Sequence, residues 1–506
     1  MAPSDPGWST AQEPSLTQRL VSGSLWNLAG TGISKAISPL FVIGVARELG
    51  AVTFGELCVV QASIGMFGAF ATFGMAQTLT KHIPEFRRED PAKTGRILAL
   101  SIWATLAMSM SLGGVFFLLA PYVSGTILNN VSLSSVLQVA AVLLVLQSLV
   151  QVQVGMLSGF EAFRSLSFSL SSQSLLCGLA TFIGAVFGGL LGAILGNVIA
   201  LLIVMLINAR LIRIESDRIR IPIRLQGCLQ ELPILYRFSM PVALGGLVSA
   251  PMRWLCSVIL VNTPQGYFYA GLYYASFRLR SLFQVLGDAI SHCILPLMAS
   301  PEGYKNTTLQ RANFLVVWLL GVVLTLPILA FPEVFAWLFG SGFSGEQFTQ
   351  TTILVALTLN VYHVQQAIFR TLITQGRVWF RFIYLAILGL VLVSAVYLLS
   401  PYGAVGYAAA FLLSKLVVLI GFTICLKQHL IPKNSILTKE SFTIWLSLAA
   451  VSATSLFVTD WTCRIGVFAF FTGLISRSIY VLLKKTRGDR VNHQLPDLGN
   501  ANAPCT

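Results

Sequence analysis

Long apolar stretches separated by short polar connections fill almost the whole of this 506-residue chain. Hydrophobic residues make up 55% of it, charged residues only 10%, and the mean hydropathy is +0.78. Apolar stretches of about 18 to 25 residues have the length that an α-helix needs to cross the hydrocarbon core of a bilayer. The chain is therefore expected to be an all-α polytopic membrane protein rather than a soluble globular one.

About fourteen transmembrane helices are predicted, at 22–46, 55–80, 97–120, 134–156, 167–187, 190–209, 235–261, 271–298, 312–330, 348–373, 382–400, 403–425, 441–458 and 464–483. Cutting the sequence there places 23 of its 33 lysines and arginines in connections on one side and only Arg47 and Arg464 on the other. Cytoplasmic loops carry the excess of Lys and Arg in membrane proteins. Both termini are therefore predicted to be cytoplasmic.

An internal repeat relates the first six predicted spans to the next six. Short motifs recur in the same order around three pairs of residues, 216, 211 and 214 positions apart: Gly55 and Gly271, Pro121 and Pro332, Gly189 and Gly403. Because each half starts and ends on the same side, the halves are expected to be parallel repeats. The predicted parts are a cytoplasmic tail (1–21), an N-lobe (22–233), a C-lobe (234–425), two additional spans (426–483) and a second cytoplasmic tail (484–506). The basic loop 209–233 is the predicted hinge between the two lobes.

Several classes of function are excluded by the residues. The net charge of +14 comes from short loops beside membrane spans, so it does not indicate nucleic-acid binding. The eight cysteines are scattered, without a CxxC motif or a His/Cys cluster, so neither a metal site nor a disulfide framework is predicted. No GxxxxGK[ST] motif is present, and no cofactor is expected.

Eight cations lie inside the predicted spans, where charge is costly and often functional. In the first span, Asn27 and Lys35 share one helical face with Thr31 and Ser38, and Pro39 follows. This pattern favours a kinked helix that faces a cavity, although a lysine that reaches for headgroups is the alternative. In the seventh span, Arg253 lies between residues that kink membrane helices, at a depth close to that of Lys35.

The eighth span carries the most informative pattern. Arg280, Gln284 and Asp288 are spaced i, i+4, i+8 and so share a face with Tyr273. Asp288 is the only acidic residue well inside a predicted span. Arg278 points about 160° away from Arg280, so one of the two arginines is expected to contact the neighbouring lobe or headgroups. The alternative to a substrate site is an internal Arg280–Asp288 pair, linked through Gln284, that serves stability alone.

Other polar residues in the spans are interpreted more simply. His363 is a candidate, together with Asp288, for ion coupling or charge pairing, although a buried histidine is more often a packing residue. Arg370 is interpreted as an anchor at the cytoplasmic end of its span, and Lys415 and Arg477 as side chains that snorkel to the interface. A cavity with this excess of cations would suit an anionic cargo such as a pyrophosphate or an acidic sugar.

The chain resembles the multidrug/oligosaccharidyl-lipid/polysaccharide exporter superfamily, and within it the Wzx-type oligosaccharide flippases. The resemblance covers about residues 20–485 and rests on the six-plus-six repeat and on the order of several loose motifs. These are Gly23-Ser24-Leu25-Trp26-Asn27, Ala46-Arg47-Glu48-Leu49-Gly50 with Phe54-Gly55, Phe73-Gly74-Met75-Ala76, Leu338-Phe339-Gly340 and Tyr402-Gly403-Ala404-Val405-Gly406.

This resemblance implies two lobes that rock about a central cavity in the bacterial cytoplasmic membrane. The cargo would be an undecaprenyl-pyrophosphate-linked oligosaccharide, flipped from the inner to the outer leaflet. The implied partners are this lipid-linked anionic glycan, membrane lipids, and the glycosyltransferases and polymerase of the same pathway. The resemblance places Lys35, Arg253 and Arg280 where such flippases carry cavity cations. The further candidate substrate-binding residues are Arg278, Asn27 and Gln284.

Three other functions are alternatives to this one. A drug or cation antiporter of the same superfamily would need cavity carboxylates, whereas Asp288 stands alone among several cations. A flippase for a lipid II-type peptidoglycan precursor would share the architecture and the anionic cargo. A membrane enzyme such as a polymerase or ligase usually carries a sizeable outer loop with catalytic residues. The longest outer connection here, 331–347, holds Glu333 and Glu346 but no His or Arg, so the chain is not expected to be an enzyme.

Overall fold

The computed structural model describes residues 16–492 except 88, 223–225, 235–238, 300–306, 376, 426–437 and 459. Throughout these residues the regular secondary structure is helical. The long helices are α1 (Leu16–Thr72), α3 (Pro91–Tyr122), α4 (Ser134–Gly159), α5 (Phe163–Arg218), α7 (Met240–Val261), α8 (Gly266–Ala299), α10 (Thr307–Ala330), α12 (Glu346–Thr374), α13 (Val378–Leu399), α14 (Gly403–Cys425), α15 (Lys439–Phe457) and α16 (Trp461–Asn492). Shorter helices are α2 (Met75–Phe86), α6 (Leu232–Ile234) and α11 (Pro332–Phe339).

The apolar character of these helices confirms the expectation of an all-α membrane protein. Among the described residues, nine helical segments are long and apolar enough to cross a membrane. Three of them, Ile37–Phe86, Phe163–Arg218 and Trp379–Cys425, are 47 to 56 residues long, which exceeds the roughly 20 residues of one crossing. The count of fourteen spans stays a prediction.

Glycines make the tight reversals inside two of the long helical segments. Gly50 in α1 has φ 72°, and Gly189 in α5 has φ 56° after Gly188. Glycine adopts these left-handed values without the steric cost that a side chain brings. The connection predicted at 188–190 therefore lies where the chain turns. After the first predicted span, the helix is interrupted only at Gly50.

Several helices continue beyond the predicted ends of the spans. The prediction of basic loops is wrong for 81–86 and 91–96, which are helical, with Asp90 capping α3 by accepting a hydrogen bond from the Lys93 N–H at 2.8 Å. It is also wrong for 209–218, because α5 runs to Arg218, and for 484–492 of the predicted tail. Hydropathy marks where lipid ends, whereas a helix ends only where a breaker or a cap stops it.

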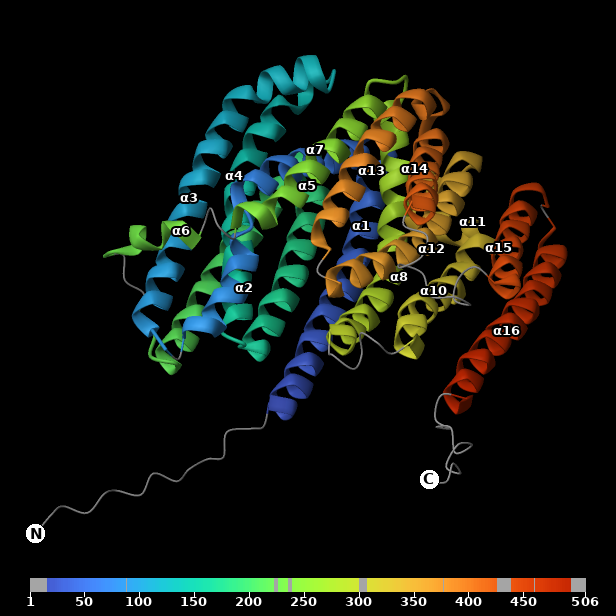
Figure 1. The fold of residues 1–506 in the computed structure, drawn as a ribbon. Helices are drawn as coiled ribbons and strands as arrows, with labels where there is room; N and C mark the ends of the chain where they lie inside the picture. Colours follow the sequence, from blue (N-terminus) through green and yellow to red (C-terminus); the bar gives the residue numbers. More distant parts are fainter. Residues whose placement is uncertain are drawn as a thin grey trace, which may run out of the picture.

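The helices form two groups that lie side by side (Figure 1). Helices α1 to α5 make up one side of the molecule, helices α8 to α14 the other, and α15 and α16 lie at the outer edge of the second group. We call α1–α5 the N-lobe and α8–α14, together with α7 that packs against α13, the C-lobe. The domain boundaries and the parallel repeat stay predictions.

The two lobes approach most closely where α1 crosses α8. A Cβ atom on Gly55 would lie 1.9 Å from the Tyr267 carbonyl oxygen, and a Cβ on Gly271 would lie 1.9 Å from the Ala51 carbonyl oxygen. Only glycine permits this backbone contact. Gly55 and Gly271 are one of the pairs that the predicted repeat relates. Equivalent residues would meet in this way at an axis shared by two repeats.

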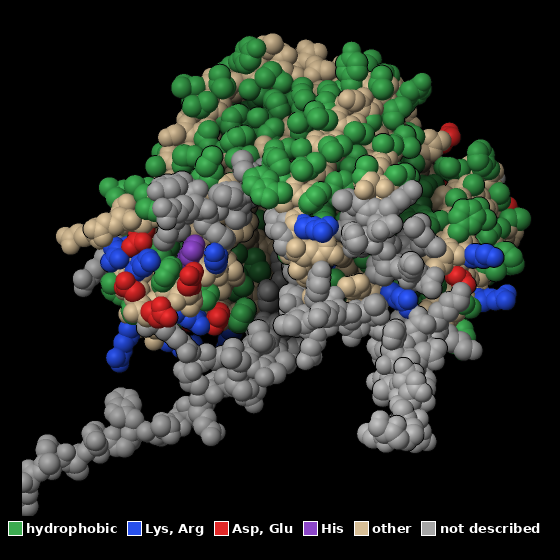
Figure 2. Space-filling model, in the orientation of Figure 1, with side chains coloured by type: hydrophobic (Ala, Val, Ile, Leu, Met, Phe, Trp, Pro, Cys, Tyr) green, Lys and Arg blue, Asp and Glu red, His purple; other side chains and the backbone are tan. Residues whose placement is uncertain are grey.

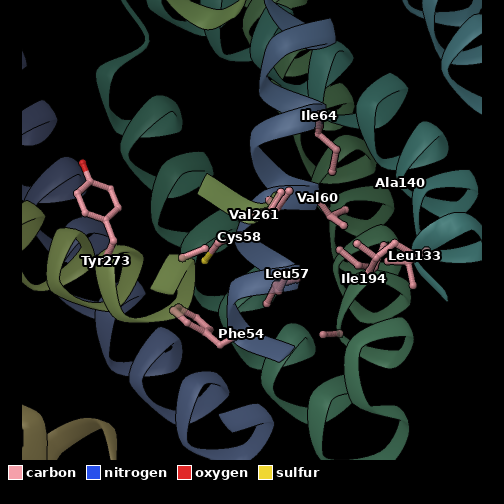
Figure 3. Packing of buried hydrophobic residues seen from close by; sticks show 14 of the residues in the cluster. Phe54, Leu57, Cys58, Val60, Ile64, Leu133, Ala140, Ile194, Val261 and Tyr273 are labelled. Carbon is pink, nitrogen blue, oxygen red and sulfur yellow. The ribbon is translucent and has the colours of Figure 1, made fainter. Parts of the chain in front are cut away.

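Apolar residues on the other side of α1 build the core of the N-lobe (Figure 3). Leu57, Val60 and Ile64 point from α1 toward Leu133 just before α4, Ala140 on α4 and Ile194 on α5, and all of them are buried. Their spacing of three and four residues keeps them on one helical face. α1 therefore serves both lobes: one face packs in the N-lobe core while another meets α8.

Charged side chains gather at one end of the molecule (Figure 2). In this view the upper part is almost entirely apolar, whereas Lys, Arg, Asp and Glu lie at the lower end, mostly over the N-lobe. Figure 1 shows that α1 begins and α16 ends at the same lower end. This distribution is typical of a protein whose basic end faces the cytoplasm. The side on which the termini lie stays a prediction.

Reporter fusions test that orientation. Fusions after Lys93 or Arg220 are expected to report the cytoplasm, and fusions after Gln265 or Ser344 the opposite side, because the basic connections orient the helices. Paired alkaline phosphatase and fluorescent-protein fusions give opposite signals on the two sides and so control for expression. Reversed signals at two or more of the four positions would contradict the predicted topology.

Candidate functional site

A line of hydrogen-bonded polar side chains follows one face of α8 in the C-lobe. Arg280 Nη2 donates to Gln284 Oε1 at 2.9 Å, and Gln284 Nε2 donates to Asp288 Oδ2 at 3.2 Å. Tyr362 on α12 donates its hydroxyl to Asp288 Oδ1 at 3.3 Å. The i, i+4 spacing predicted this shared face. Asp288 forms no ion pair with any described residue, and Gln284 links the arginine to the carboxylate, which is the geometry that the alternative of an internal pair also predicts.

Arg280 is held between two aromatic rings. Its guanidinium carbon lies 5.2 Å from the ring centre of Phe277 and 5.3 Å from that of Tyr362. The side chain is only 5% exposed, and its Nε has no hydrogen-bond partner among the described residues. Cation–π contacts of this kind hold a guanidinium in place but leave N–H groups free to bind an anion.

Lys415 on α14 belongs to the same cluster. Its Nζ lies 5.3 Å from the centre of the Tyr362 ring, the ring that Arg280 also contacts, and its charge is within electrostatic range of Arg253 and Arg280. The interpretation of Lys415 as a snorkelling side chain is therefore wrong. Its place near the middle of α14 is too far from either end for the ammonium group to reach the headgroups easily.

Arg253 lies on an open face of α7. Its side chain is exposed, and among the described residues its guanidinium has no hydrogen-bond partner. Two turns earlier on the same face, a Cβ on Gly246 would meet nothing within 4 Å. The neighbours on either side are engaged, since Met252 packs against Gly389 of α13 and Trp254 donates to Ser63 Oγ of α1 at 2.9 Å. Arg253 thus carries an exposed charge within electrostatic range of Lys415.

Arg278 reaches the N-lobe instead. Its Nη2 donates to Gln61 Oε1 on α1 at 3.0 Å. This contact agrees with the expectation that only one of the two neighbouring arginines faces the C-lobe cavity and that the other contacts the neighbouring lobe. Together with the Trp254–Ser63 hydrogen bond, it joins the lobes along the part of α1 that follows Gly50.

Arg370 is a buried structural residue, so its interpretation as an interfacial anchor is wrong. Its Nε and Nη2 donate to the side chain and backbone oxygens of Asn313 on α10 at 2.6 and 3.2 Å, and its Nη1 donates to Ser291 Oγ on α8 at 2.7 Å. Three helices are tied together by these bonds. Since the side chain is 6% exposed, its charge still adds to the positive field of the C-lobe.

His363 fills a gap between two glycines. A Cβ on Gly287 would lie 2.2 Å from its Cε1, and a Cβ on Gly321 would lie 2.5 Å from its Cδ2. Neither ring nitrogen has a hydrogen-bond partner among the described residues. These contacts are those of a packing residue, and the role of His363 in ion coupling stays a prediction.

Lys35 and Asn27 lie on the first part of α1, but their side chains fall outside the described part of the structure. Their place in the site therefore stays a prediction. Among the described residues, no group of three or more His, Cys, Asp or Glu could hold a metal ion.

Contacts between the lobes also close the end of the molecule that carries few charges. Arg47 Nη2 donates to the Trp337 carbonyl oxygen of α11 at 2.8 Å, and Phe54 packs edge-on against Phe343 at 6.1 Å. Tyr267 donates its hydroxyl to the Leu128 carbonyl oxygen at 2.7 Å. At the charged end, the hydroxyls of Thr78 on α2 and Ser239 lie 2.7 Å apart.

Solved membrane transporters share this arrangement of helices. The C-lobe carries a cluster of cations backed by aromatic rings, and comparison with solved structures gives the same fold. The chain is similar to the lipid II flippase MurJ in an inward closed conformation, with a TM-score of 0.70 and 14% identity over 92% of this chain and 99% of that chain. It is also similar to an inward-facing multidrug resistance MATE family transporter of the MOP superfamily, with a TM-score of 0.58 and 14% identity over 86% and 96% of the two chains.

The sequence places the chain within a particular family. The model of the polysaccharide biosynthesis protein family matches residues 20–302, more than half of the chain, and the protein belongs to this family. A curated relative, the EPS I polysaccharide export inner membrane protein EpsE of Ralstonia nicotianae (strain ATCC BAA-1114 / GMI1000), is 22% identical over 390 residues, which cover 76% of this chain and 88% of the relative. Family and fold confirm the predicted superfamily and the expectation that the chain is not an enzyme.

Proposed function

We propose that this protein flips a lipid-linked anionic oligosaccharide across the bacterial cytoplasmic membrane by alternating access. The cargo is an undecaprenyl-pyrophosphate-linked repeat unit of a polysaccharide, taken from the inner leaflet and released at the outer leaflet. The observation that carries the proposal is the charge balance of the C-lobe cluster, in which Asp288 is the only described carboxylate and the cations are Arg253, Arg280, Arg370 and Lys415. Both termini lie in the cytoplasm in this proposal.

The electrostatics of the cluster support an anionic cargo. Unit charges about 4 Å apart interact by about 1 kcal/mol in water and by about 4 kcal/mol at the lower effective dielectric near a protein. Arginine also offers a planar fork of N–H groups that fits phosphate oxygens, and Arg280 and Arg253 have donors to spare. Membership of a polysaccharide biosynthesis family and the likeness to an exopolysaccharide export protein support a glycan as the remainder of the cargo.

A lipid II-type precursor is the second candidate, and the likeness to MurJ favours it. Such a cargo would use the same pyrophosphate-binding cations, so the glycan decides between the two. A drug or cation antiporter fits less well, because Asp288 is the only carboxylate in the described cluster. The glycosyltransferases and the polymerase that make and extend the repeat unit are proposed partners.

Transport of the lipid itself tests the proposal. The lipid-linked repeat unit is isolated from cells that lack the transporter and placed in vesicles with the purified protein. The protein is expected to move this lipid from the inner to the outer leaflet of the vesicle, where an added glycosidase cleaves it. Vesicles without protein and vesicles with lipid II serve as the two comparisons. Transport of lipid II alone would favour the second candidate, and efflux of cationic dyes without transport of either lipid would overturn the proposal.

A further inference from the structure

The N-lobe carries a second, uncharged polar surface on α4. Two glutamines of α4, Gln147 and Gln151, are exposed although they lie in the middle of an apolar helix. Polar side chains inside a membrane protein almost always face the bundle interior or a water-filled cavity. Their direction can be settled from the contacts of their own helix.

Both glutamines lie on the face of α4 that packs against α1 and α2. On the side of their helix nearer Ser134, the same face carries Ala140 and Leu144, which are buried in the core that α1 shares with α4 (Figure 3). Toward the other end it carries Gly155, where a Cβ would lie 2.6 Å from Ala76 Cα of α2. The spacing i, i+4, i+7, i+11, i+15 keeps these five residues on one side of the helix. This face is packed at both ends, at Ala140 and Leu144 and at Gly155, and it is exposed between them at the two glutamines.

The lipid-facing side of α4 is a different one. Val142 is 49% exposed and points about 140° away from Gln147 around the helix. An apolar side chain is expected to face lipid there, as it does on other membrane helices. α4 therefore has two exposed sides, one apolar and one made of amides.

The facing stretch of α1 leaves room in front of the amides. Gln61, Gly65 and Gly68 share a helical face, and a Cβ on either glycine would meet nothing within 4 Å. A Cβ on Gly155 would contact Ala76, and a Cβ on Gly159 would contact Leu79. α4 therefore runs parallel to the stretch from α1 into α2, in a register that places Gln147 level with Gly68. Gln61, at the start of this face, is the residue to which Arg278 of the C-lobe donates.

We propose that Gln147 and Gln151 form a subsite for the uncharged hydroxyl groups of the glycan, which we call the amide face. An amide side chain both donates and accepts hydrogen bonds, as sugar hydroxyls do, and carries no charge that competes for phosphate. The cationic C-lobe cluster holds the pyrophosphate, and the amide face across the cavity holds the sugars. This inference rests on the proposed function and assigns the two ends of the cargo to different lobes.

Accessibility tests the geometry independently of transport. In a variant without its native cysteines, Gln147→Cys is expected to react with a membrane-impermeant thiol reagent added from the open side of the cavity, whereas Val142→Cys is not, because lipid covers it. Faster labelling at 142 than at 147 would overturn the amide face. This result does not depend on the identity of the cargo.

Binding of two lipids tests the assignment to sugar. The double variant Gln147→Leu/Gln151→Leu is expected to bind the lipid-linked repeat unit about tenfold more weakly, equivalent to about 1.4 kcal/mol. Its binding of sugar-free undecaprenyl pyrophosphate is expected to change less than about twofold, because the phosphate contacts remain. Val142→Leu is the matched control on the lipid side of α4. Equal weakening of both lipids, or no weakening of either, would overturn the proposal.

A third variant separates this inference from the proposed function. Arg280→Gln is expected to weaken the binding of both lipids, since it removes a pyrophosphate contact. If Arg280→Gln binds both lipids normally while the glutamine variant still discriminates between them, the amide face stands and the cationic site fails. A wild-type protein that binds neither lipid would overturn the proposed function and the sugar assignment, while the labelling experiment would still decide whether the face opens to water.

Discussion

Replacing Arg280 with alanine is expected to reduce glycan export by at least roughly 30-fold. Removal of one partner of a buried charged hydrogen bond costs about 2 to 5 kcal/mol, which corresponds to that factor or more. Arg280 is buried between Phe277 and Tyr362, with N–H groups that no described residue uses. A cargo phosphate would supply the missing acceptor. Arg280→Lys should recover only part of the activity, because lysine keeps the charge but lacks the planar fork.

The measurement is surface polysaccharide in a strain that lacks the transporter, with the level of each variant in the membrane quantified in parallel. Arg477→Ala is the matched control, since Arg477 is exposed on α16 outside the cluster and is expected to be dispensable. Arg253→Ala should lose export as well, because its guanidinium is free in the same space. Normal export by Arg280→Ala at a normal protein level would remove the residue from the site.

Local spacing carried most of what the sequence could predict about the site. Arg280, Gln284 and Asp288 lie on one helix, so 3.6 residues per turn is enough to place them on a shared face. The same reasoning separated Arg278 from Arg280, and the structure gives Arg278 a partner in the other lobe. No contact with a second helix was needed for these predictions.

The residues that the sequence did not identify depend on packing between helices. Lys415 comes within reach of Arg280 only because both lie beside the Tyr362 ring, which α12 supplies. Arg370 is satisfied by Asn313, 57 positions earlier in the chain. Neither contact leaves a pattern in the sequence around the charged residue, so a lone cation in a span looks the same whether it snorkels, packs or binds.

The prediction of helix ends and of contacts between the lobes was limited for a similar reason. Hydropathy located the apolar part of each helix but not its polar continuation, as in α5 up to Arg218. Conversely, the repeat singled out Gly55 and Gly271 through recurring motifs alone, and the structure shows a reason for glycine at both positions, namely the backbone contact between α1 and α8. The recurring motifs thus singled out two glycines, whereas the contact between α1 and α8 at these glycines required coordinates.

Covalent closure of the charged end is expected to block transport completely. The hydroxyls of Thr78 on α2 and Ser239 lie 2.7 Å apart, and they join the N-lobe to the segment that leads into the C-lobe. Sulfur atoms in place of these oxygens would start close to the disulfide bond length of about 2.05 Å. If the lobes alternate access, this contact must open in every cycle, so Thr78→Cys/Ser239→Cys should lose export on oxidation and regain it on reduction.

The control is a pair of hydroxyls with similar geometry inside one lobe. Ser276 on α8 and Thr352 on α12 lie 2.9 Å apart and both belong to the C-lobe, so Ser276→Cys/Thr352→Cys should tolerate oxidation without loss of export. Both double variants are made after replacement of the eight native cysteines, and crosslinking is quantified by mass spectrometry of the oxidised protein. Full transport by a quantitatively crosslinked 78–239 variant would contradict alternating access through this end, because the lobes would then pass the glycan without separating there.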